Sequence, residues 1–419
     1  QALISAMKTH QKYFHLNDAS SGSLLPAFIT VANIESQQPE QVVSGNERVI
    51  RPRLSDAAFF FANDKQSPLI SRQERLGSVV FQHHLGSLLD KTHRIVAIAK
   101  QLADAIGADE ATAVRAAALS KCDLVSEMVL EFPELQGIAG AEYARHDDEP
   151  AGVAEAIEYH YYPRFAGDEL PPSPEATAVA LADRLDTLVG IFGIGEPPTG
   201  SKDPFALRRA SLAVIRMLIN LKKPLSLTGL LQAVVEQHTA DLSPDTPDVV
   251  SHYITERLGN WYDDDGINIS VVRAALAAGA TDLFDIDLRV RALNAFAKTE
   301  TAEHLAAANK RVANILAKAD NLDGTPADPN LFVHEAEHAL HEAISRVGST
   351  LAPLLADRNY QSALDELAQL RGPVDAFFDG VMVNAEDPVE RLNRLRLLDG
   401  LRALFTQVAD LALLSSAAE

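Results

Sequence analysis

The sequence predicts a mainly α, multidomain helical chain with a small α+β remnant at its N-terminus. Three observations support this fold class. From about residue 66 onward, apolar residues recur at intervals of three and four, which is the period of an amphipathic helix. Proline and acidic residues stand at the expected starts of these helices. Only the first 65 residues contain short runs rich in β-branched and aromatic side chains, as strands do.

The N-terminal region is expected to contain extended segments. Residues 24–31 are rich in β-branched and aromatic side chains, so we predict a strand there. Residues 44–46 (Ser-Gly-Asn) give a turn signal. A second extended run is predicted over residues 48–50, and Pro52 biases Arg51, just after it, toward extended geometry. Three basic residues, Arg48, Arg51 and Arg53, alternate along this run and the residues directly after it.

Capping residues mark the limits of the central helices. Gly107 is placed to end one helix in the left-handed conformation. Ser173 and Pro174 begin another as N-cap and first-turn proline. Asp203 and the proline after it begin a third in the same way. The predicted helices span residues 88–106, 111–130, 174–189 and 205–221.

Polar, proline-bearing connectors separate helical segments at residues 241–247 and 320–330. Together with the change of pattern near residue 66, they suggest four regions. These are the end of an N-terminal α+β domain (residues 1–65), a helical domain (66–224), a helical linker (225–290) and a C-terminal helical domain (291–419).

The composition limits the class of protein. Charged residues make up 23% and apolar residues 47% of the chain, so packed domains rather than disorder are expected. Cys122 is the single cysteine and cannot form an internal disulfide, which fits a reducing, cytoplasmic location. No apolar run approaches the roughly 18 residues that span a bilayer, so no membrane association is expected. The chain begins with Gln1 rather than methionine, and we expect it to be a segment of a longer protein.

The charge pattern bears on nucleic-acid binding. The net charge of −21 repels phosphate at a distance. Screening limits this repulsion to about 8 Å at physiological salt, so local basic stripes decide contact. A single stripe is usually a solvated helix face, but four stripes in an acidic chain favour some contact with phosphate. The stripes comprise Arg48, Arg51 and Arg53; Lys202, Arg208, Arg209 and Arg216; Asn309, Lys310, Arg311, Asn314 and Lys318; and Arg391, Arg394, Arg396 and Arg402.

A dispersed set of metal-type ligands lies on successive predicted helices. Its members are His93, Cys122, Asp123, His146 and Asp183. Their order resembles the HD superfamily, in which a helical bundle holds a histidine, a His-Asp pair and a late aspartate around metal ions. Cys122 stands where that pair has its histidine, and a thiol changes both the softness and the geometry of a ligand set. We therefore expect an HD-like bundle without a metal, and an HD-type metal-dependent phosphohydrolase is the alternative.

Residues 334–338 (His-Glu-Ala-Glu-His) match the zinc-protease pattern, in which two histidines four apart on a helix share one zinc. His341 and Glu342 follow one turn later as further potential ligands. The segment resembles an exposed, charged helix start, so chance metal binding is the simpler explanation. Residues 195–202 nearly match a phosphate loop, but two prolines remove amide donors that such a loop needs. We interpret this run as a structured loop before the Asp203 cap.

Longer motifs resemble the beta subunit of bacterial glycyl-tRNA synthetase, and the resemblance runs through nearly the whole chain. It is weakest over residues 225–290, and the histidines of residues 334–341 lie outside the family pattern. The motifs occupy residues 11–14, 28–35, 44–54, 119–124, 143–147, 190–195, 202–210, 308–318 and 373–379.

The resemblance implies a tRNA-binding partner rather than the catalytic subunit. It implies an α2β2 heterotetramer in which the alpha subunit, using ATP with Mg, forms glycyl-adenylate and charges tRNA(Gly). It implies that residues 291–419 resemble the helical anticodon-binding module shared with arginyl-tRNA synthetase. It also implies no catalytic residue and no cofactor on this chain. The residues agree: no His-Ile-Gly-His or Lys-Met-Ser-Lys-Ser motif occurs, and strand content after residue 66 is too low for an antiparallel catalytic sheet.

Overall fold

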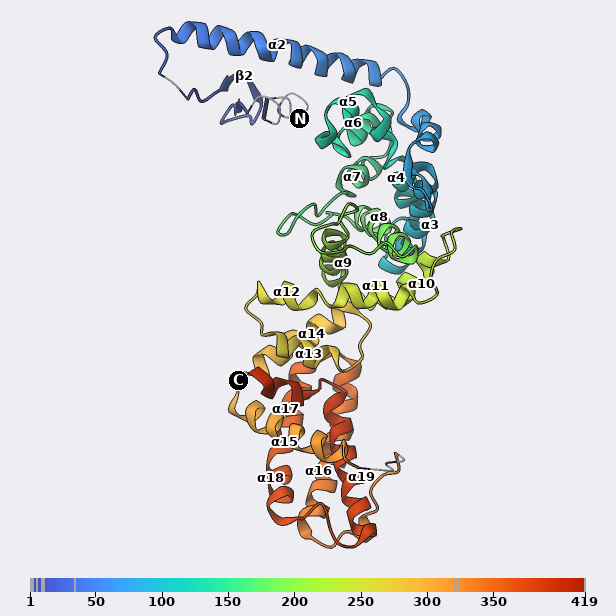
Figure 1. The fold of residues 1–419 in the computed structure, drawn as a ribbon, viewed down its shortest axis with the longest axis vertical. Helices are drawn as coiled ribbons and strands as arrows, with labels where there is room; N and C mark the ends of the chain where they lie inside the picture. The colour runs from blue at the N-terminus through green and yellow to red at the C-terminus, as the bar shows by residue number, and fades with distance from the viewer. Residues whose placement is uncertain are drawn as a thin grey trace. The chain divides into compact units, whose positions relative to one another are not determined.

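The structure is a computed structural model that describes residues 4, 7–8, 12–33, 35–319, 322 and 324–417. The chain forms two compact units: unit 1 is Gln1–Met217 with Leu231–Val250, and unit 2 is Leu218–Leu230 with Ser251–Glu419. Helices dominate both units (Figure 1), and two two-stranded sheets are the strands of the described residues. The prediction of a mainly α chain is therefore confirmed. The finer division at residues 65, 224 and 290 stays a prediction.

The N-terminal region pairs a small hairpin with one long helix. Strands β1 (Phe14–Asn17) and β2 (Leu24–Ile29) are antiparallel, which confirms the predicted strand near residue 24. The predicted extended run at residues 48–50 is wrong, because these residues lie inside helix α2 (Pro39–Asp64). Ile50 is buried with Tyr13, and Leu54 packs against the same cluster. Residues four apart share a helix face, so packing on the hairpin outweighs the local bias from proline.

A bundle of helices forms the centre of unit 1. Helix α3 packs against α4 and α8, and α7 packs against α4, α6 and α8. The predicted boundaries of α3 and the start of α8 are confirmed: Gly107 ends α3 with φ 74°, and the Ser173 side chain caps α8. The elements are η2 (Leu69–Ser78), β3 (Val80–Gln82), β4 (Gly86–Ser87), α3 (Leu88–Ile106), α4 (Glu110–Leu119), η3 (Cys122–Val125), α5 (Glu127–Glu131), η4 (Pro133–Leu135), α6 (Ile138–His146), α7 (Ala151–Tyr159) and α8 (Pro174–Gly193).

The helix predicted over residues 111–130 is interrupted. Helix α4 ends at Leu119, and a 3-10 turn separates it from α5. Ser126 starts α5, because its hydroxyl oxygen accepts a hydrogen bond from Val129 N at 3.2 Å. The interruption directs Lys121 toward α8, where its ammonium group contacts Asp183.

Three helices each contain residues of both units. They are α9 (Leu207–Leu221), α10 (Leu227–Val235) and α11 (Thr246–Thr255). The helix predicted from residue 205 begins two residues later, at Leu207. Asp203 still caps it, since its carboxylate accepts hydrogen bonds from Leu207 N at 2.8 Å and Arg208 N at 3.0 Å. The preceding phosphate-loop-like run is a structured loop in which Thr199 and Lys202 form a β-bridge, as expected.

Unit 2 is helical in its described residues. Helix α15 packs against α18 and α19, while α16 packs against α17, α18 and α19. Among the described residues, we find no helix with the length and apolar character needed to cross a bilayer. The elements are α12 (Leu258–Asp263), α13 (Ile269–Leu276), α14 (Leu283–Phe296), α15 (Glu300–Leu316), η5 (Pro329–Leu331), α16 (Glu335–Ala356), α17 (Tyr360–Ala368), α18 (Arg371–Gly380), α19 (Pro388–Thr406) and η6 (Leu411–Ala417).

Candidate nucleic-acid interface

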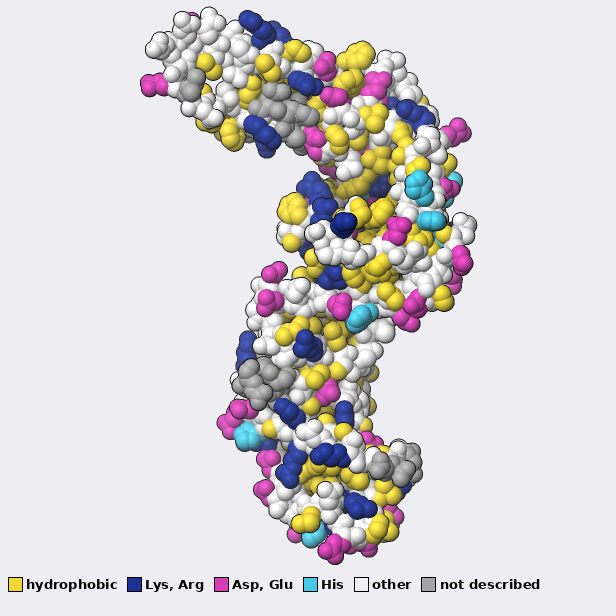
Figure 2. Space-filling model, in the orientation of Figure 1, with side chains coloured by type: hydrophobic (Ala, Val, Ile, Leu, Met, Phe, Trp, Pro, Cys, Tyr) yellow, Lys and Arg dark blue, Asp and Glu magenta, His cyan; other side chains and the backbone are white. Residues whose placement is uncertain are grey.

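A groove of about 1540 Å³ lies on unit 2 between α15, α18 and α19. Figure 2 shows Lys and Arg side chains gathered around an apolar patch in the region where Figure 1 labels these helices. The connector between α18 and α19 forms one wall through Val381, Met382, Val383 and Asn384. The groove therefore brings together two of the basic stripes found in the sequence, those of α15 and α19. Its polar side chains are Lys310, Arg311, Asn314, Lys318, Asp379, Asn384 and Arg391.

The cationic face of α15 follows from the helical period. Thr299 begins the helix, because its hydroxyl oxygen accepts a hydrogen bond from Ala302 N at 3.2 Å. One face is apolar and packs into the core, so the basic residues occupy the opposite, exposed face. The buried face comprises Ala302, Leu305, Ala306, Asn309, Val312 and Leu316. The exposed face comprises Lys310, Arg311 and Asn314, and the exposed Lys318 follows just after the end of the helix.

The groove is locally positive in an acidic chain. Among the described residues that line it, Asp379 is the one carboxylate, against four cationic side chains. None of the four forms an ion pair with another described residue, so their charges are available to a ligand. The Arg311 guanidinium carbon lies 4.1 Å from the centroid of the Phe378 ring. Because screening confines charge effects to about 8 Å, this groove can attract phosphate despite the net charge of −21.

Two residues predicted on the basic stripes lie in the core instead. The expectation that Asn309 is on the surface is wrong: its amide is buried and donates to Leu305 O at 3.1 Å. The same expectation is wrong for Arg394, whose side chain is 3% exposed. Its Nε lies 2.8 Å from Glu337 Oε1 and its guanidinium 3.2 Å from Glu390 Oε2. Helical spacing alone did not show which side of the stripe would pack inward.

Arg394 is buried and holds one wall of the groove in place. Its guanidinium donates to Met382 O at 3.0 Å, and so fixes the connector that forms one wall. Met382 itself is 75% exposed, while Val381 and Val383 on either side are buried. Arg394 is thus a positioning residue that holds Met382 at the surface. Of the other predicted residues of α19, Arg396 and Arg402 are half-buried, and Arg391 is exposed at the groove.

The basic residues predicted in unit 1 are dispersed. Arg48 and Arg51 are exposed on α2, whereas Arg53 pairs with Glu131 at 3.0 Å. These three lie on a helix, not on the extended run that was expected.

The second basic stripe of unit 1 lies around the start of α9. Lys202 is exposed in the loop before the helix, and Arg208 donates to Gly200 O at 2.6 Å. Arg209 is exposed and lines a smaller pocket of about 430 Å³ beside Asp183. The structure therefore brings only part of this stripe to a concave surface.

The five HD-type positions do not converge. Asp183 lies in a cluster of charged side chains. The side chains of His93 and His146 are exposed and do not join it. Cys122 is buried, and its thiol lies 3.6 Å from Ala118 O near the end of α4. The Asp123 carboxylate accepts hydrogen bonds from Gly137 N and Gly140 N. No group of three potential metal ligands occurs among the described residues.

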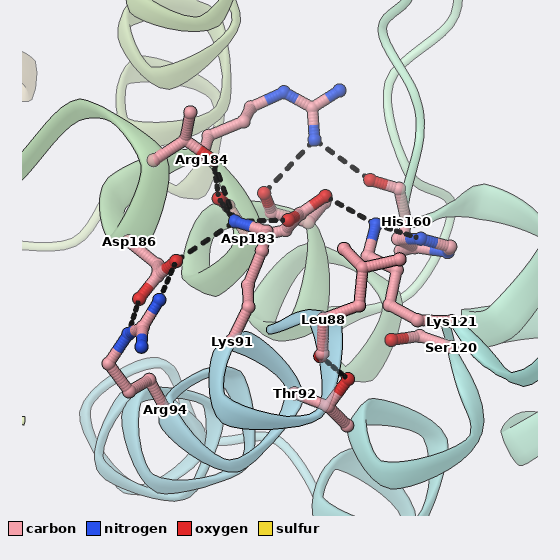
Figure 3. A network of polar contacts seen from close by, with 12 residues as sticks. Leu88, Lys91, Thr92, Arg94, Ser120, Lys121, His160, Asp183, Arg184 and Asp186 are labelled. Carbon is pink, nitrogen blue, oxygen red and sulfur yellow. Dashed lines mark hydrogen bonds and ion pairs between the residues drawn. The ribbon is translucent and has the colours of Figure 1, made fainter. Parts of the chain in front are cut away.

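Two lysines pair with Asp183, the last residue of the HD-type order. Figure 3 shows Lys91 from α3 and Lys121 from the turn after α4 pointing at Asp183 of α8. Their Nζ atoms lie 2.9 Å and 2.7 Å from the two carboxylate oxygens of Asp183. Lys121 Nζ also lies 2.9 Å from His160 Nε2. Asp186 extends the network, because it pairs with Lys91 at 2.9 Å.

Burial and pairing set the charge states of this cluster. Burial disfavours the charged form of Asp183, but the ammonium groups of Lys121 and Lys91 outweigh it and hold the pKa of Asp183 well below its usual range. Burial lowers the pKa of Lys121, and Lys91 lowers it further by repulsion. Burial and Lys121 also hold the pKa of His160 far below its usual value. The carboxylate of Asp183 therefore keeps two mutually repelling cations together.

These residues do not fit a catalytic metal. A metal hydrolase needs several anionic or neutral ligands and an open position for water. Here the one aspartate of the motif that lies in the cluster is already neutralised by two ammonium groups. We therefore derive no hydrolytic step for this domain, and the phosphohydrolase alternative is not favoured.

The pH dependence of stability tests whether Asp123 is a buried structural carboxyl. Burial raises the pKa of Asp123 to about 6, despite the hydrogen bonds from Gly137 N and Gly140 N. Its Oδ1 has no hydrogen-bond partner among the described atoms, so an amide fits as well as a carboxylate. A raised pKa means that the carboxyl stabilises the fold most below about pH 4, and this contribution is lost as the pH rises through about 6.

We expect Asp123→Asn to remove that loss. The free energy of unfolding of the variant minus that of the wild type should increase by about 3 kcal/mol in total as the pH rises from about 4 to 8. Urea unfolding at several pH values, followed by far-UV circular dichroism, measures the difference. A difference between variant and wild type that does not change with pH would contradict the assignment.

The zinc-protease pattern does not form a metal site either. His334 lies before α16 with an extended backbone (φ −107°, ψ 144°), so it is outside the helix that carries His338. Glu337 between them is buried, and its carboxylate accepts hydrogen bonds from Val333 N and His334 N at the helix start. The glutamate serves as a capping residue and as the partner of Arg394.

Comparison with known proteins decides the family. Residues 1–277 match the family model described as glycyl-tRNA synthetase beta subunit. Glycine–tRNA ligase beta subunits of Chromohalobacter salexigens and Ectopseudomonas mendocina are 53% and 52% identical over 98% and 99% of this chain. The chain belongs to the glycyl-tRNA synthetase beta subunit family. It spans 60% of the length of each of these two relatives.

A second match falls on the groove. Residues 305–414 match the model of the DALR anticodon binding domain. This range contains α18, α19 and most of α15, and therefore every residue that lines the groove. In this member of the glycyl-tRNA synthetase beta subunit family, the cationic groove thus coincides with a module whose name refers to anticodons.

Sequence reasoning missed several residues of both sites. Phe378, Met382 and Asn384 lie in or beside a recognised motif, but nothing in their spacing indicated a groove. Lys91 and Lys121 were missed because charged residues are expected at the surface. Lys121 carries one usable signal, since it follows the small and apolar run of residues 116–119, which is typical of a buried helix.

Proposed function

We propose that this chain is the tRNA-binding part of a glycine–tRNA ligase beta subunit. The observation that carries the proposal is the groove of α15, α18 and α19, where four cations that form no ion pair with any described residue surround an exposed apolar patch within the anticodon-domain match. Anticodon bases are splayed from the stem, so they are recognised by stacking and by hydrogen bonds to base edges, while cations hold the backbone. The groove offers side chains for all three kinds of contact.

The ligation itself is proposed to occur on a partner subunit. The names of the relatives contain the words beta subunit, which implies such a partner. We infer that an alpha subunit activates glycine with ATP and Mg and that the two assemble as α2β2 in the cytoplasm. The beta chain would then contribute by binding tRNA(Gly) and orienting it toward the alpha subunit. Its own residues would hold and position the RNA without entering the chemical step.

Binding of a tRNA(Gly) transcript at rising salt tests this proposal. The logarithm of the association constant should fall linearly with the logarithm of the salt concentration between about 50 and 200 mM, by about 0.7–0.9 per phosphate contact. Lys310→Ala and Lys318→Ala should each weaken binding and reduce the slope by about 1, since each ammonium group would neutralise one phosphate. Fluorescence anisotropy of labelled transcript measures both quantities.

Arg346→Ala serves as the matched control, because Arg346 is exposed on α16 but does not line the groove. It should change neither the affinity nor the slope. If Arg346→Ala weakened binding as much as Lys310→Ala does, tRNA contact would not be specific to the groove. If the wild-type chain showed no salt-dependent binding, even with its partner subunit present, the proposed function would be wrong.

A further inference from the structure

One pair of side chains in the groove is arranged for more than holding phosphate. The Arg311 guanidinium lies over the Phe378 ring, at 4.1 Å from its centroid, and joins α15 to α18. Phe378 is half-buried and Arg311 is exposed, so the ring covers one face of the guanidinium and leaves the other available. A planar cation that an aromatic ring supports from below is a surface on which a base can stack.

We propose that Arg311, supported by Phe378, is the stacking platform for one unpaired nucleobase of RNA. The inference rests on the proposed function and assigns a specific task to two residues of the same groove. The base would lie on the exposed face of the guanidinium, giving the order ring, guanidinium, base. Stacking on an arginine plane or an aromatic ring is the usual way in which proteins hold splayed RNA bases.

The surroundings of the platform suit a base rather than a phosphate alone. Asn314 lies one turn after Arg311 on α15, and Asn384 lies on the connector wall of the same groove. Both are exposed, and neither side-chain amide has a hydrogen-bond partner among the described residues. An amide offers a donor and an acceptor together, which matches the edge of a base. Met382, 75% exposed on the same wall, adds an apolar surface for the sugar or the base.

The other cations of the groove serve as a natural comparison. Lys310 and Lys318 are also exposed there, but no aromatic ring supports them in the described structure. A lysine ammonium is a compact charge without a planar surface, so it can neutralise phosphate but cannot stack. Arg311→Lys therefore keeps the charge and removes the platform, which separates the two roles of this side chain.

A cycle between protein variants and abasic RNA tests the platform. The whole chain, as wild type, Arg311→Lys, Phe378→Leu and Lys310→Ala, would be titrated with a tRNA(Gly) transcript. The transcripts would be intact or would lack the base at one unpaired anticodon-loop position at a time. We expect Arg311→Lys to weaken binding of intact RNA by about 5- to 150-fold, the range for one stacked base. Removing the stacked base should weaken binding of wild-type protein by a similar factor.

The decisive result is that the two losses do not add. For the RNA that lacks the base at one particular loop position, Arg311→Lys and Phe378→Leu should cause little further loss of affinity. Lys310→Ala should instead weaken binding of every RNA by the same factor. If Arg311→Lys weakened binding by the same factor whichever base was absent, the stacking platform would be wrong, while the proposed function would stand. Absence of salt-dependent binding by the wild type would overturn both.

Discussion

Replacing Asp183 by asparagine is expected to lower the free energy of unfolding of unit 1 by about 3–5 kcal/mol, the usual cost of breaking a buried ion pair from one side. The substitution conserves shape and removes one negative charge. Lys91 and Lys121, whose side chains are 5% and 4% exposed, would then face each other without the carboxylate between them. Repulsion between two desolvated ammonium groups is the physical reason for the loss. Urea unfolding followed by far-UV circular dichroism measures it.

Two companion variants make this result specific. Glu110→Gln neutralises an acid in an exposed pair with Lys100 and should change stability by less than about 1 kcal/mol. Asp183→Asn combined with Lys121→Met should recover part of the loss, because the unpaired cation is removed with its partner. A single variant as stable as the wild type would show that Asp183 does not hold the two lysines together.

The second large effect concerns Arg394 on α19. Arg394→Met is expected to destabilise unit 2 by about 3–5 kcal/mol, since it leaves the carboxylate of Glu337 buried without its cation. The two side chains are 3% and 1% exposed and lie 2.8 Å apart. Urea unfolding followed by the fluorescence of Trp261, the single tryptophan and a residue of unit 2, measures the change.

Arg391 on the same helix supplies the matched control. It is exposed at the groove, so Arg391→Met should leave the unfolding transition within about 0.5 kcal/mol of the wild type. It should nevertheless weaken tRNA binding under native conditions. Combining Arg394→Met with Glu337→Gln should restore part of the stability lost in the single variant, because the amide carries no charge and its oxygen can still accept from Val333 N and His334 N. The reverse pattern, with Arg391 needed for stability and Arg394 only for RNA, would refute the roles assigned to them.

Predictions from local sequence succeeded where local interactions determine the structure. The end of α3 and the start of α8 follow from Gly107 and Ser173, whose effects act within a few residues. Prediction failed at residues 48–50 and at residues 120–126. There, packing against the hairpin and the contact between Lys121 and Asp183 decide the backbone. Such contacts join residues far apart in the chain, so no window of neighbouring residues contains them.

The candidate groove illustrates the same division. The period of α15 predicts that Lys310, Arg311 and Asn314 share a helix, and the structure places all three at the groove. The helical period could not predict that Asn309, which precedes Lys310 in the chain, packs inward, because that depends on the direction from which other helices approach. Nor could it reveal that Phe378 would lie under Arg311, since the two residues belong to different helices.

By itself, the sequence determined the helical class of this protein, its family, and the presence of cationic stripes in an acidic chain. These depend on composition, period and long motifs, which are properties of the chain in order. Only the tertiary structure decided which charges are buried and which are free. It placed Lys91, Lys121 and Arg394 in the interior and left Lys310, Arg311 and Arg391 at a groove. The physical reason is that the free energy of a charge depends on its solvent and its partners, and folding alone assigns both.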